Sequence, residues 1–249
     1  MIVNIDFAGL EWKTILEWSQ DPVGIDEVLH EVDAHSDNQN AFGLPSRLIA
    51  KVFLFRAIFR GKAFAYANDP DFIKVSKDVQ FWQDVIDRFY LKYRGISLIH
   101  NKCLQEVYRT GQYESPITGR IYKYKKYNNR GVMDYNDSEI VNLPVQGAGA
   151  DIVTVFRNYV GRRIHSSHYR DDILLLGTVH DSCIWDVRNK SSLDYLLAVV
   201  EEAFTELANE WKRIYGFRLT VPHGYAVEVG KRSYGDTESL FEKKVVTFA

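Results

Sequence analysis

A four-residue repeat is the feature that most constrains how this sequence folds. Within residues 47–61 (RLIAKVFLFRAIFRG) the repeated positions are Arg47, Lys51, Phe55 and Phe59. Four steps of about 100° pass a full turn by only about 40°, so a helix places these side chains on one slowly drifting face. That face is cationic toward its N-terminal end and aromatic toward its C-terminal end. It suits a ligand with an anionic tail and a flat ring, such as a nucleoside triphosphate; the alternative is a buried helix whose long cationic side chains reach solvent.

Two apolar stretches, one early and one late in the chain, each carry an acid where a strand is expected to end. Residues 2–7 (IVNIDF) predict a buried strand that includes Asp6. Residues 173–187 (ILLLGTVHDSCIWDV) predict a β-hairpin whose polar turn holds His180 and Asp181. Two carboxylates about 4 Å apart repel by roughly 4 kcal/mol at an effective dielectric constant of about 20, so a pair brought together favours a divalent cation such as Mg²⁺. Taken singly, these acids are more typical of a strand end and of a turn.

Helical periodicity and turn residues organise the rest of the chain. Ser46 follows Pro45 and is expected to cap the helix that opens at Arg47. Helices are expected at residues 12–18, 25–32, 47–61, 71–77, 79–93, 96–110, 147–165 and 193–215. Another strand is expected at 217–229, followed by a weak tail at 239–249. This order predicts an α+β fold with a helical insertion.

Composition limits the class of protein. With 249 residues, 46% of them hydrophobic, the chain can bury a large core in one or two domains. No apolar run is long enough to span a membrane and the N-terminus has no signal-peptide pattern, so we expect a cytoplasmic protein. Cys103 and Cys183 form no disulfide framework or zinc site and are expected to be reduced thiols. The net charge of −2 does not indicate a strongly basic nucleic-acid-binding domain, although local patches can act instead.

Several motifs together resemble those of family A DNA polymerases. They are IDFAGLEWK at 5–13, DAHSDNQNAFGLPSRLIAKVFLFRAIFRG at 33–61, NLPVQGAGADIV at 142–153, GTVHDSCIWDV at 177–187 and VPHGYAVEVGKRSYGD at 221–236. They occur in the order typical of the family, and FGLPSR is most similar to replicative enzymes of phages. The resemblance implies a polymerase palm, an antiparallel sheet with a catalytic hairpin, and an inserted helical fingers subdomain. Residues 1–30 and 136–249 would form the palm and residues 31–135 the fingers.

The resemblance implies DNA synthesis by two-metal nucleotidyl transfer from a dNTP to a primer 3′-hydroxyl. Asp6 and Asp181 match the carboxylates that hold two Mg²⁺ ions, and Phe7 matches a residue whose backbone carbonyl also contacts metal. Lys51 matches a cation with both catalytic and substrate-binding roles. DNA replication is the expected process, in the cytoplasm of a bacterial host if a phage encodes the chain.

The resemblance also implies residues for the dNTP and for template–primer DNA. Glu11 matches the steric gate that excludes a ribose 2′-hydroxyl. The other matches to dNTP-binding positions are His35, Arg47 and Lys51 on the phosphates, Phe55 on the sugar and Phe59 beside the nascent base pair. The matches to DNA-binding positions are Asn142 and Gln146 in the minor groove and His180 at the primer terminus.

The sequence departs from the family pattern at several positions. Phe59 replaces a tyrosine whose hydroxyl usually bonds the gate carboxylate, which predicts weaker exclusion of ribonucleotides. Ser182 stands where DNA polymerases usually carry glutamate, and it favours an alternative, an RNA-synthesising relative. Arg60 interrupts an aromatic–glycine pair, and Ser138 stands where an arginine is common. A catalytically inactive DNA-binding or scaffold subunit is a further alternative, although the metal acids and phosphate-binding cations are retained.

The sequence starts at the first catalytic strand, so we expect the thumb, the first palm strands and an exonuclease domain to be absent from it. A second polypeptide is expected to supply thumb and remaining palm, as in a split polymerase; a truncated piece of a longer enzyme explains the sequence equally well. A basic and aromatic strip could follow a DNA backbone, although a solvated hairpin is more typical of such a pattern. The strip consists of Arg120, Lys123, Lys125, Lys126 and Arg130, interleaved with Tyr122, Tyr124 and Tyr127.

Overall fold

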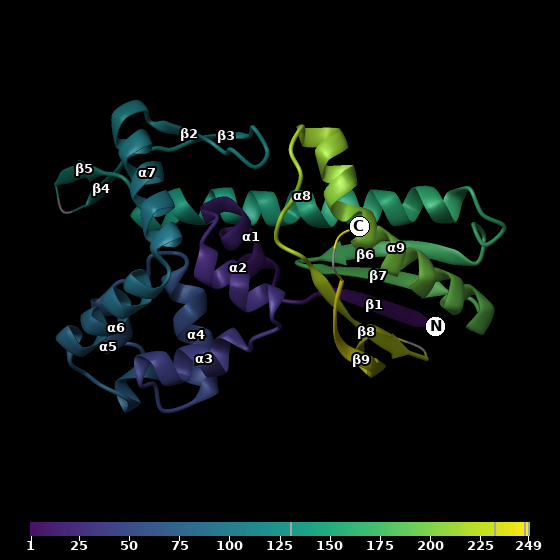
Figure 1. The fold of residues 1–249 in the computed structure, drawn as a ribbon, viewed down its shortest axis with the longest axis horizontal. Coiled ribbons are helices and arrows are strands. Elements are labelled where there is room, and N and C mark those ends of the chain that lie inside the picture. Colours follow the sequence, from purple (N-terminus) through teal and green to yellow (C-terminus); the bar gives the residue numbers. More distant parts are fainter. Residues whose placement is uncertain (130, 232, 247, 249) are drawn as a thin grey trace. The chain divides into compact units, whose positions relative to one another are not determined.

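The computed structural model describes residues 1–129, 131–231, 233–246 and 248 (Figure 1). The chain divides into two compact units, one of residues 1–13 and 147–249 and the other of residues 14–146. We call the first the sheet unit and the second the helical unit. The mixture of strands and helices confirms the predicted α+β class. The narrower division into palm and fingers, with boundaries after residues 30 and 135, stays a prediction.

The sheet unit is built on one five-stranded antiparallel sheet in the order β6-β7-β1-β8-β9. The strands are β1 (Ile2–Phe7), β6 (Ile173–Val179), β7 (Ser182–Val187), β8 (Gly224–Gly230) and β9 (Glu238–Val245). The central position of β1 between β7 and β8 puts the first strand of the chain in the middle of the sheet. The predicted strand at 2–7 and the predicted hairpin at 173–187 are both confirmed.

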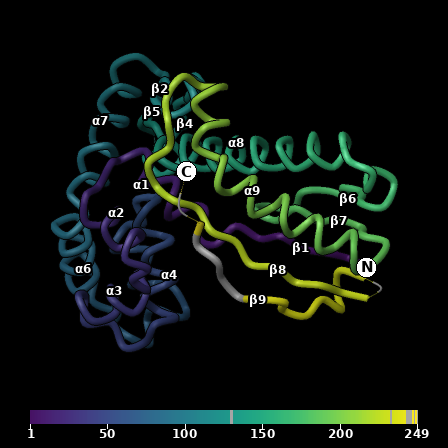
Figure 2. The backbone as a smooth tube through the Cα atoms, turned by 45° about the vertical axis from the view of Figure 1, so that its right-hand side comes forward, coloured from purple at the N-terminus to yellow at the C-terminus, as the bar shows by residue number. Residues whose placement is uncertain are grey.

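Two long helices bury one face of this sheet. They are α8 (Asp137–His165), of which residues 147–165 belong to the sheet unit, and α9 (Lys190–Tyr215). The ring of Phe7 on β1 lies 5.2 Å from Phe156 of α8 and 4.8 Å from Phe204 of α9. In both views the helices run beside the strands (Figures 1 and 2). Because side chains alternate along a strand, Phe7 facing the helices leaves Asp6 on the opposite face.

The helical unit packs around large aromatic side chains. Its helices are α2 (Pro22–Leu29), α3 (Ala34–Phe42), α4 (Arg47–Ala57), α5 (Ala63–Ala67), α6 (Val79–Lys92) and α7 (Arg94–Thr110), and α1 (Leu10–Ser19) enters it from the sheet unit. Two small hairpins follow, β2 (Gln112–Glu114) with β3 (Ile121–Lys123), and β4 (Tyr127–Asn129) with β5 (Val132–Asp134). Phe53 is at the centre, with ring centroids 5.8 Å from Phe42, 5.3 Å from Tyr66 and 6.2 Å from Phe89.

Helix α4 begins where the sequence predicted and ends earlier. The Ser46 hydroxyl accepts a hydrogen bond of 3.2 Å from the Ile49 amide, which confirms it as the N-cap. The helix ends at Ala57 rather than at Gly61, because Arg60 takes a left-handed conformation with a φ of 58°. The Arg60 amide donates to the Ala57 carbonyl and the Gly61 amide to the Arg56 carbonyl, a pattern that satisfies the carbonyls of a helix end.

Helix α8 begins at Asp137, so the expectation that it starts after Gly147 was wrong. Pro144 lies inside it and has no N–H to donate to the carbonyl of Ile140, which would leave that group unsatisfied. The Tyr124 hydroxyl donates to this carbonyl at 3.0 Å and the Cys103 thiol at 3.7 Å. Tertiary donors therefore replace the lost helical hydrogen bond, and the helix continues through the proline.

Other boundaries also differ from the sequence prediction. The helix expected at 71–77 is only a short 3₁₀ turn, Phe72–Lys74, and β8 begins at Gly224 rather than at residue 217. Helix α3 was not predicted, and the expected weak tail forms edge strand β9 with a short 3₁₀ turn, Tyr234–Asp236, before it.

None of the helices in the described residues has the length and apolar character needed to cross a membrane.

Candidate active site

Strand pairing brings the two predicted metal-binding acids together. In the β1–β7 ladder Asp6 pairs with Ser182, the residue directly after Asp181. The Phe7 amide also donates a hydrogen bond of 3.1 Å to the Asp181 backbone carbonyl. The end of β1 is thereby tied to the turn between β6 and β7, and both acids lie at the same end of the sheet.

The charge of Asp181 acts on the Asp6 carboxyl group. Burial raises the pKa of Asp6, and the negative charge of Asp181 raises it further. The Ser182 hydroxyl donates to Asp6 Oδ1 at 2.5 Å, and this hydrogen bond lowers the same pKa. Converging carboxylate oxygens are the donors that Mg²⁺ prefers, so the residues present fit this ion. No three histidine, cysteine, aspartate or glutamate side chains form a metal-binding group in the described residues.

The turn that carries Asp181 is strained. His180 is an exposed residue with a φ of 54°, a left-handed conformation that costs a residue with a Cβ about 1–2 kcal/mol. A positive φ at the first position of a two-residue hairpin loop matches the right-handed twist of the strands. The tight turn places His180 at the tip and Asp181 beside β1. Strain of this kind is concentrated at functional sites.

Glu11, the predicted sugar gate, lies in the first turn of α1 within the sheet unit. Gly9 joins β1 to α1 with a φ of 66°, which glycine adopts without steric cost, and so the chain turns sharply after the strand. The Ala8 amide donates a hydrogen bond of 2.8 Å to the Gly224 carbonyl and fixes the start of this turn to β8. Glu11 is therefore five residues beyond Asp6, on a segment anchored to the same sheet.

The predicted triphosphate face of α4 is turned away from the core of the helical unit. The buried positions of this helix are Ala50, Phe53, Leu54 and Ala57. Arg47 and Lys51 are exposed, and Phe55 and Phe59 are partly exposed. Only three of the four repeated positions lie on α4, because Phe59 follows the end of the helix at Ala57. The cationic and aromatic ends of the face are both accessible to a ligand.

Arg47 is held by an acid from the start of α3. Its Nε lies 2.6 Å from Asp33 Oδ2 and one terminal nitrogen 3.0 Å from Asp33 Oδ1, the forked geometry with which arginine also binds phosphate. This hydrogen bonding holds the pKa of Asp33 well below its usual range. The rings of His35 and Phe55 lie 6.2 Å apart. Three predicted dNTP-binding residues, His35, Arg47 and Phe55, thus lie on neighbouring parts of α3 and α4.

The predicted DNA-binding residues divide between the two units. Asn142 is partly exposed and Gln146 is exposed, and both lie on one face of α8, four residues apart. They belong to the helical unit with His35, Arg47, Lys51, Phe55 and Phe59, whereas Asp6, Phe7, Glu11, His180 and Asp181 belong to the sheet unit.

The predicted basic strip and a cationic face of α8 have different surroundings. Lys123, Lys125 and Lys126 are exposed, and Lys126 Nζ lies 5.2 Å from the centre of the Tyr135 ring; Arg130 lies outside the described residues. On α8, Arg162 bonds Glu210 at 2.7 Å and Arg163 bonds Glu202 at 2.9 Å, both on α9. These ion pairs link α8 to α9 within the sheet unit, and both arginine side chains remain about half exposed. The role of the strip in DNA binding stays a prediction.

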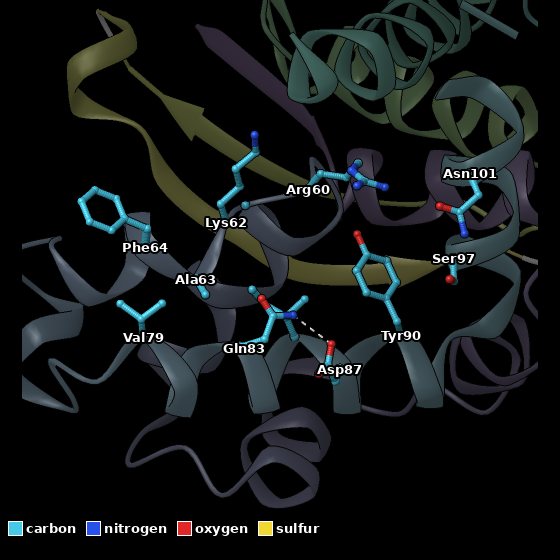
Figure 3. Close-up of a pocket in the computed structure, with 12 residues that line it drawn as sticks. Arg60, Lys62, Ala63, Phe64, Val79, Gln83, Asp87, Tyr90, Ser97 and Asn101 are labelled. Atoms are coloured by element: carbon cyan, nitrogen blue, oxygen red, sulfur yellow. Dashed lines mark hydrogen bonds between the residues drawn. The ribbon is translucent and has the colours of Figure 1, made fainter. Parts of the chain in front are cut away.

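A pocket of about 480 Å³ lies beyond the C-terminal end of α4 in the helical unit (Figure 3). Arg60 and Lys62 stand along one side of it and Tyr90 projects into it from α6. Gln83 donates to Asp87 at 2.9 Å on its floor. The pocket therefore combines cations, an aromatic ring and hydrogen-bonding groups directly after the predicted dNTP-binding helix.

Sequence reasoning missed three polar residues beside the acid pair. Ser182 was treated only as a departure from a family pattern, whereas it bonds Asp6 directly. Asn4 shares a strand face with Asp6, and a period of two along residues 2–7 could have revealed it. Glu228 lies opposite Asn4 on β8, a pairing that depends on strand register and has no local sequence signal.

Comparisons with known proteins show the family to which this chain belongs. The sequence model of DNA polymerase family A matches residues 1–236. DNA polymerase I of Lactococcus lactis subsp. lactis is 23% identical over 217 residues, which are 83% of this chain and 24% of that protein. The DNA polymerase of Bacillus phage SP01 is 22% identical over 246 residues, 95% of this chain and 26% of that protein. The chain thus spans about a quarter of the length of these relatives.

A solved structure has the same fold. The POL domain of Pol1 from M. smegmatis, in complex with DNA primer-template and dNTP, matches with a TM-score of 0.72 and 19% identity. The match covers 95% of this chain and 40% of that chain. The fold, the paired acids and the family match over residues 1–236 lead to one conclusion: the chain belongs to DNA polymerase family A.

Proposed function

We propose that this chain catalyses template-directed DNA synthesis, transferring a nucleotidyl group from a dNTP to a primer 3′-hydroxyl by a two-metal mechanism. The observation that carries the proposal is the meeting of Asp6 and Asp181 at one end of the sheet, in a chain of this polymerase family. Two neighbouring carboxylates repel each other unless a cation or a proton lies between them.

The sheet unit supplies the proposed metal site. Asp6 and Asp181 would hold two Mg²⁺ ions, with the backbone carbonyl of Phe7 as a further oxygen donor. The ions would activate the primer 3′-hydroxyl and neutralise charge on the departing pyrophosphate. Ser182 holds Asp6 Oδ1 by its hydrogen bond and so limits the orientations of that carboxylate. His180, at the tip of the strained turn, is the proposed contact for the primer terminus.

The helical unit supplies the proposed dNTP site. Arg47 would fork onto phosphate oxygens, and Lys51, one turn further along α4, would act as a point charge on the triphosphate and on the pyrophosphate that leaves from it. His35 adds a contact to the phosphates. Phe55 and Phe59 offer apolar surface to the sugar and the base pair, and their partial exposure leaves that surface accessible. Asn142 and Gln146 are the proposed minor-groove contacts.

Sugar selection distinguishes the proposal from a second candidate function. Glu11 is the proposed gate against a 2′-hydroxyl, and Phe59 has no hydroxyl with which to hold it. Ser182 favours RNA synthesis as the second candidate. Incorporation of one dNTP and of the matching rNTP opposite the same template base separates the two functions. A preference for the dNTP supports DNA synthesis, whereas equal or faster use of the rNTP supports the RNA-synthesising relative.

The proposal includes a second polypeptide that supplies thumb and remaining palm, with or without an exonuclease domain. Edge strand β6 supports it, because Leu174, Leu175 and Leu176 are 53%, 41% and 57% exposed on a strand with an unpaired edge. Such an edge is a ready surface for another chain. The proposed setting is the cytoplasm, that of a bacterial host if a phage encodes the chain.

Primer extension tests the proposed function. Protein isolated from its native source, together with whatever co-purifies, should extend a primer on a defined template in the presence of dNTPs and Mg²⁺, and EDTA should stop extension. Processive extension by the isolated chain alone contradicts the need for a second polypeptide. DNA binding with no incorporation under any of these conditions supports an inactive scaffold subunit and contradicts the proposal.

A further inference from the structure

Glu228 lies on the same sheet face as the proposed metal-binding pair. Strand β8 pairs with β1 so that Ala226 is opposite Asp6 and Glu228 is opposite Asn4. Asn4 and Asp6 are two residues apart on β1 and therefore point to one side of the sheet. Glu228 is the diagonal neighbour of Asp6, a relation that separates Cα atoms by about 7–8 Å and that long side chains can bridge.

Two hydrogen bonds hold the Glu228 carboxylate in place. Its Oε2 accepts from Asn4 Nδ2 at 3.2 Å and from the Thr237 hydroxyl at 3.3 Å. No ion pair to a basic side chain is formed by Glu228 in the part of the chain that the structure describes. Its negative charge acts on Asp6, where it adds to the increase in pKa that burial and Asp181 cause. A fixed, partly buried carboxylate without a cation therefore faces the paired acids.

Asn4 gives a second indication that this face of the sheet binds water or an ion. The residue is only 4% exposed, and its Oδ1 is a buried acceptor without a hydrogen-bond donor among the described residues. An unsatisfied buried polar atom costs about 1–3 kcal/mol, and native proteins seldom leave one without water or an ion. A hydrated cation beside Asp6 would bring water protons to this part of the sheet.

We propose that Glu228 is a positioning residue for the metal site, accepting a hydrogen bond from water bound to the Mg²⁺ that Asp6 holds. The inference rests on the proposed function. Mg²⁺ keeps several of its waters when it binds proteins, and carboxylates one layer out orient what the direct ligands hold. Glu228 is a diagonal neighbour of Asp6 and its carboxylate is held by Asn4 and Thr237, so we assign it a contact through water rather than direct ligation. It also adds negative potential that attracts the cation.

The purely structural alternative gives Glu228 a different role. Its hydrogen bonds to Asn4 and Thr237 tie β1, β8 and the segment before β9 together. In that case the side chain would matter for stability and would leave metal affinity unchanged. Glu228→Gln separates the roles, because the amide keeps the size of the side chain and an oxygen that accepts both hydrogen bonds while it removes the charge.

The test uses Mn²⁺ as the probe, with affinity measured from the electron paramagnetic resonance signal of free Mn²⁺ during a titration of the full chain. Glu228→Gln should weaken Mn²⁺ binding by about 10- to 100-fold, the usual effect of losing a residue in the second layer of a metal site. The Mg²⁺ concentration for half-maximal incorporation should rise in parallel, with the rate at saturating Mg²⁺ changed much less. The melting temperature in EDTA should stay within a few degrees of the wild-type value.

Asp186→Asn is the matched control. Asp186 pairs with Ile2 in the β1–β7 ladder, so it lies on the Asn4–Asp6 face but four residues along β1 from Asp6. The control removes one negative charge from the same face and should leave Mn²⁺ affinity close to wild type.

Three results would overturn the inference. Unchanged Mn²⁺ affinity in Glu228→Gln would contradict the role of Glu228 at the metal site and leave the proposed function intact. A lower melting temperature in EDTA, without any change in metal affinity, would assign Glu228 the purely structural role and would also leave the proposed function intact. Wild-type protein that binds Mn²⁺ no better than Asp6→Asn would contradict the proposed metal site itself, and the inference with it.

Discussion

The Ser182 hydroxyl donates a hydrogen bond of 2.5 Å to Oδ1 of Asp6, from strand β7 to the neighbouring central strand β1. Ser182 is only 5% exposed, so solvent does not compete for this contact. One oxygen of the proposed metal-binding carboxylate is therefore held by the neighbouring strand. The residue that departs from the family pattern has a direct structural role at the acid pair.

Ser182→Ala should weaken the proposed metal site. Hydrogen bonds to charged groups contribute about 1.5–3 kcal/mol, so loss of this one should raise the Mg²⁺ concentration for half-maximal incorporation by about tenfold or more. The measurement is initial rate of primer extension over a Mg²⁺ titration. Ser182→Thr keeps the hydroxyl and should stay close to wild type. Identical Mg²⁺ curves for Ser182→Ala and wild type would show that the hydrogen bond does not hold Asp6 for metal binding.

Asp33→Asn should improve binding of the incoming nucleotide. Asp33 occupies the guanidinium of Arg47, which the triphosphate would have to take over in the proposed function. An exposed ion pair contributes about 0.2–1 kcal/mol, so its removal should lower KM for the dNTP by about two- to fivefold with kcat unchanged. Asparagine can still cap α3 in place of Asp33, which limits the cost to folding.

The control for Asp33→Asn is Asp71→Asn, which breaks the exposed Asp71–Lys74 pair in the same unit. It should leave KM unchanged. An increase in KM in Asp33→Asn would instead mean that Asp33 positions Arg47 for the nucleotide.

Arg60→Gly should stabilise the protein. Arg60 has a φ of 58° at the end of α4, where a residue with a Cβ is strained and glycine is not. We expect the free energy of unfolding to rise by about 1 kcal/mol, measured by urea denaturation. Arg88→Gly makes the same change at an exposed position inside α6 and should lower it by about 1 kcal/mol. Destabilisation in both variants would show that the Arg60 side chain adds more to the free energy of unfolding than the strained backbone of Arg60 removes.

His100 should make the folded state sensitive to acid. Burial lowers the pKa of His100 to about 3, from an ordinary value of about 6.5. Below pH 6.5 the unfolded chain binds a proton that the folded chain does not, so stability falls as the pH falls from 6.5 toward 3, by about 1.4 kcal/mol per pH unit.

Urea denaturation at pH 7 and pH 5 measures this effect. His100→Gln should lose about 2 kcal/mol less than wild type over that interval. The variant should keep some acid sensitivity, because burial also lowers the pKa of His223 in the sheet unit. An equal loss in wild type and variant would mean that His100 becomes protonated in the folded state.

Local signals explain which parts of the fold the sequence predicted. The apolar run at residues 2–7, the polar turn at His180–Asp181 and the Ser46 cap each depend on neighbours within a few residues, and all three are present. The start of α8 was missed because Pro144 is a helix breaker by local rules. Its effect is offset by Tyr124, a residue twenty positions earlier in the chain. Only the tertiary fold reveals that donor.

The candidate site also contains contacts that the sequence could not predict. Sequence motifs placed Asp6 and Asp181 in the correct strand and turn, but the positions of Ser182 and Glu228 around them depend on strand register. The Asp33–Arg47 pair joins the start of one helix to the start of the next, and α3 itself was not predicted. A residue's own neighbours in sequence carry no signal for contacts of this kind.

The central claim is that Asp6 and Asp181 form a shared cation site for nucleotidyl transfer. The most direct measurement is single-nucleotide incorporation at saturating Mg²⁺ by Asp181→Asn, with Asp186→Asn as the control in the same hairpin. Metal catalysis contributes several kcal/mol, so Asp181→Asn should slow incorporation by about 1,000-fold or more while the control stays within a few-fold of wild type. Incorporation by Asp181→Asn at the wild-type rate, in a folded protein, would contradict the account.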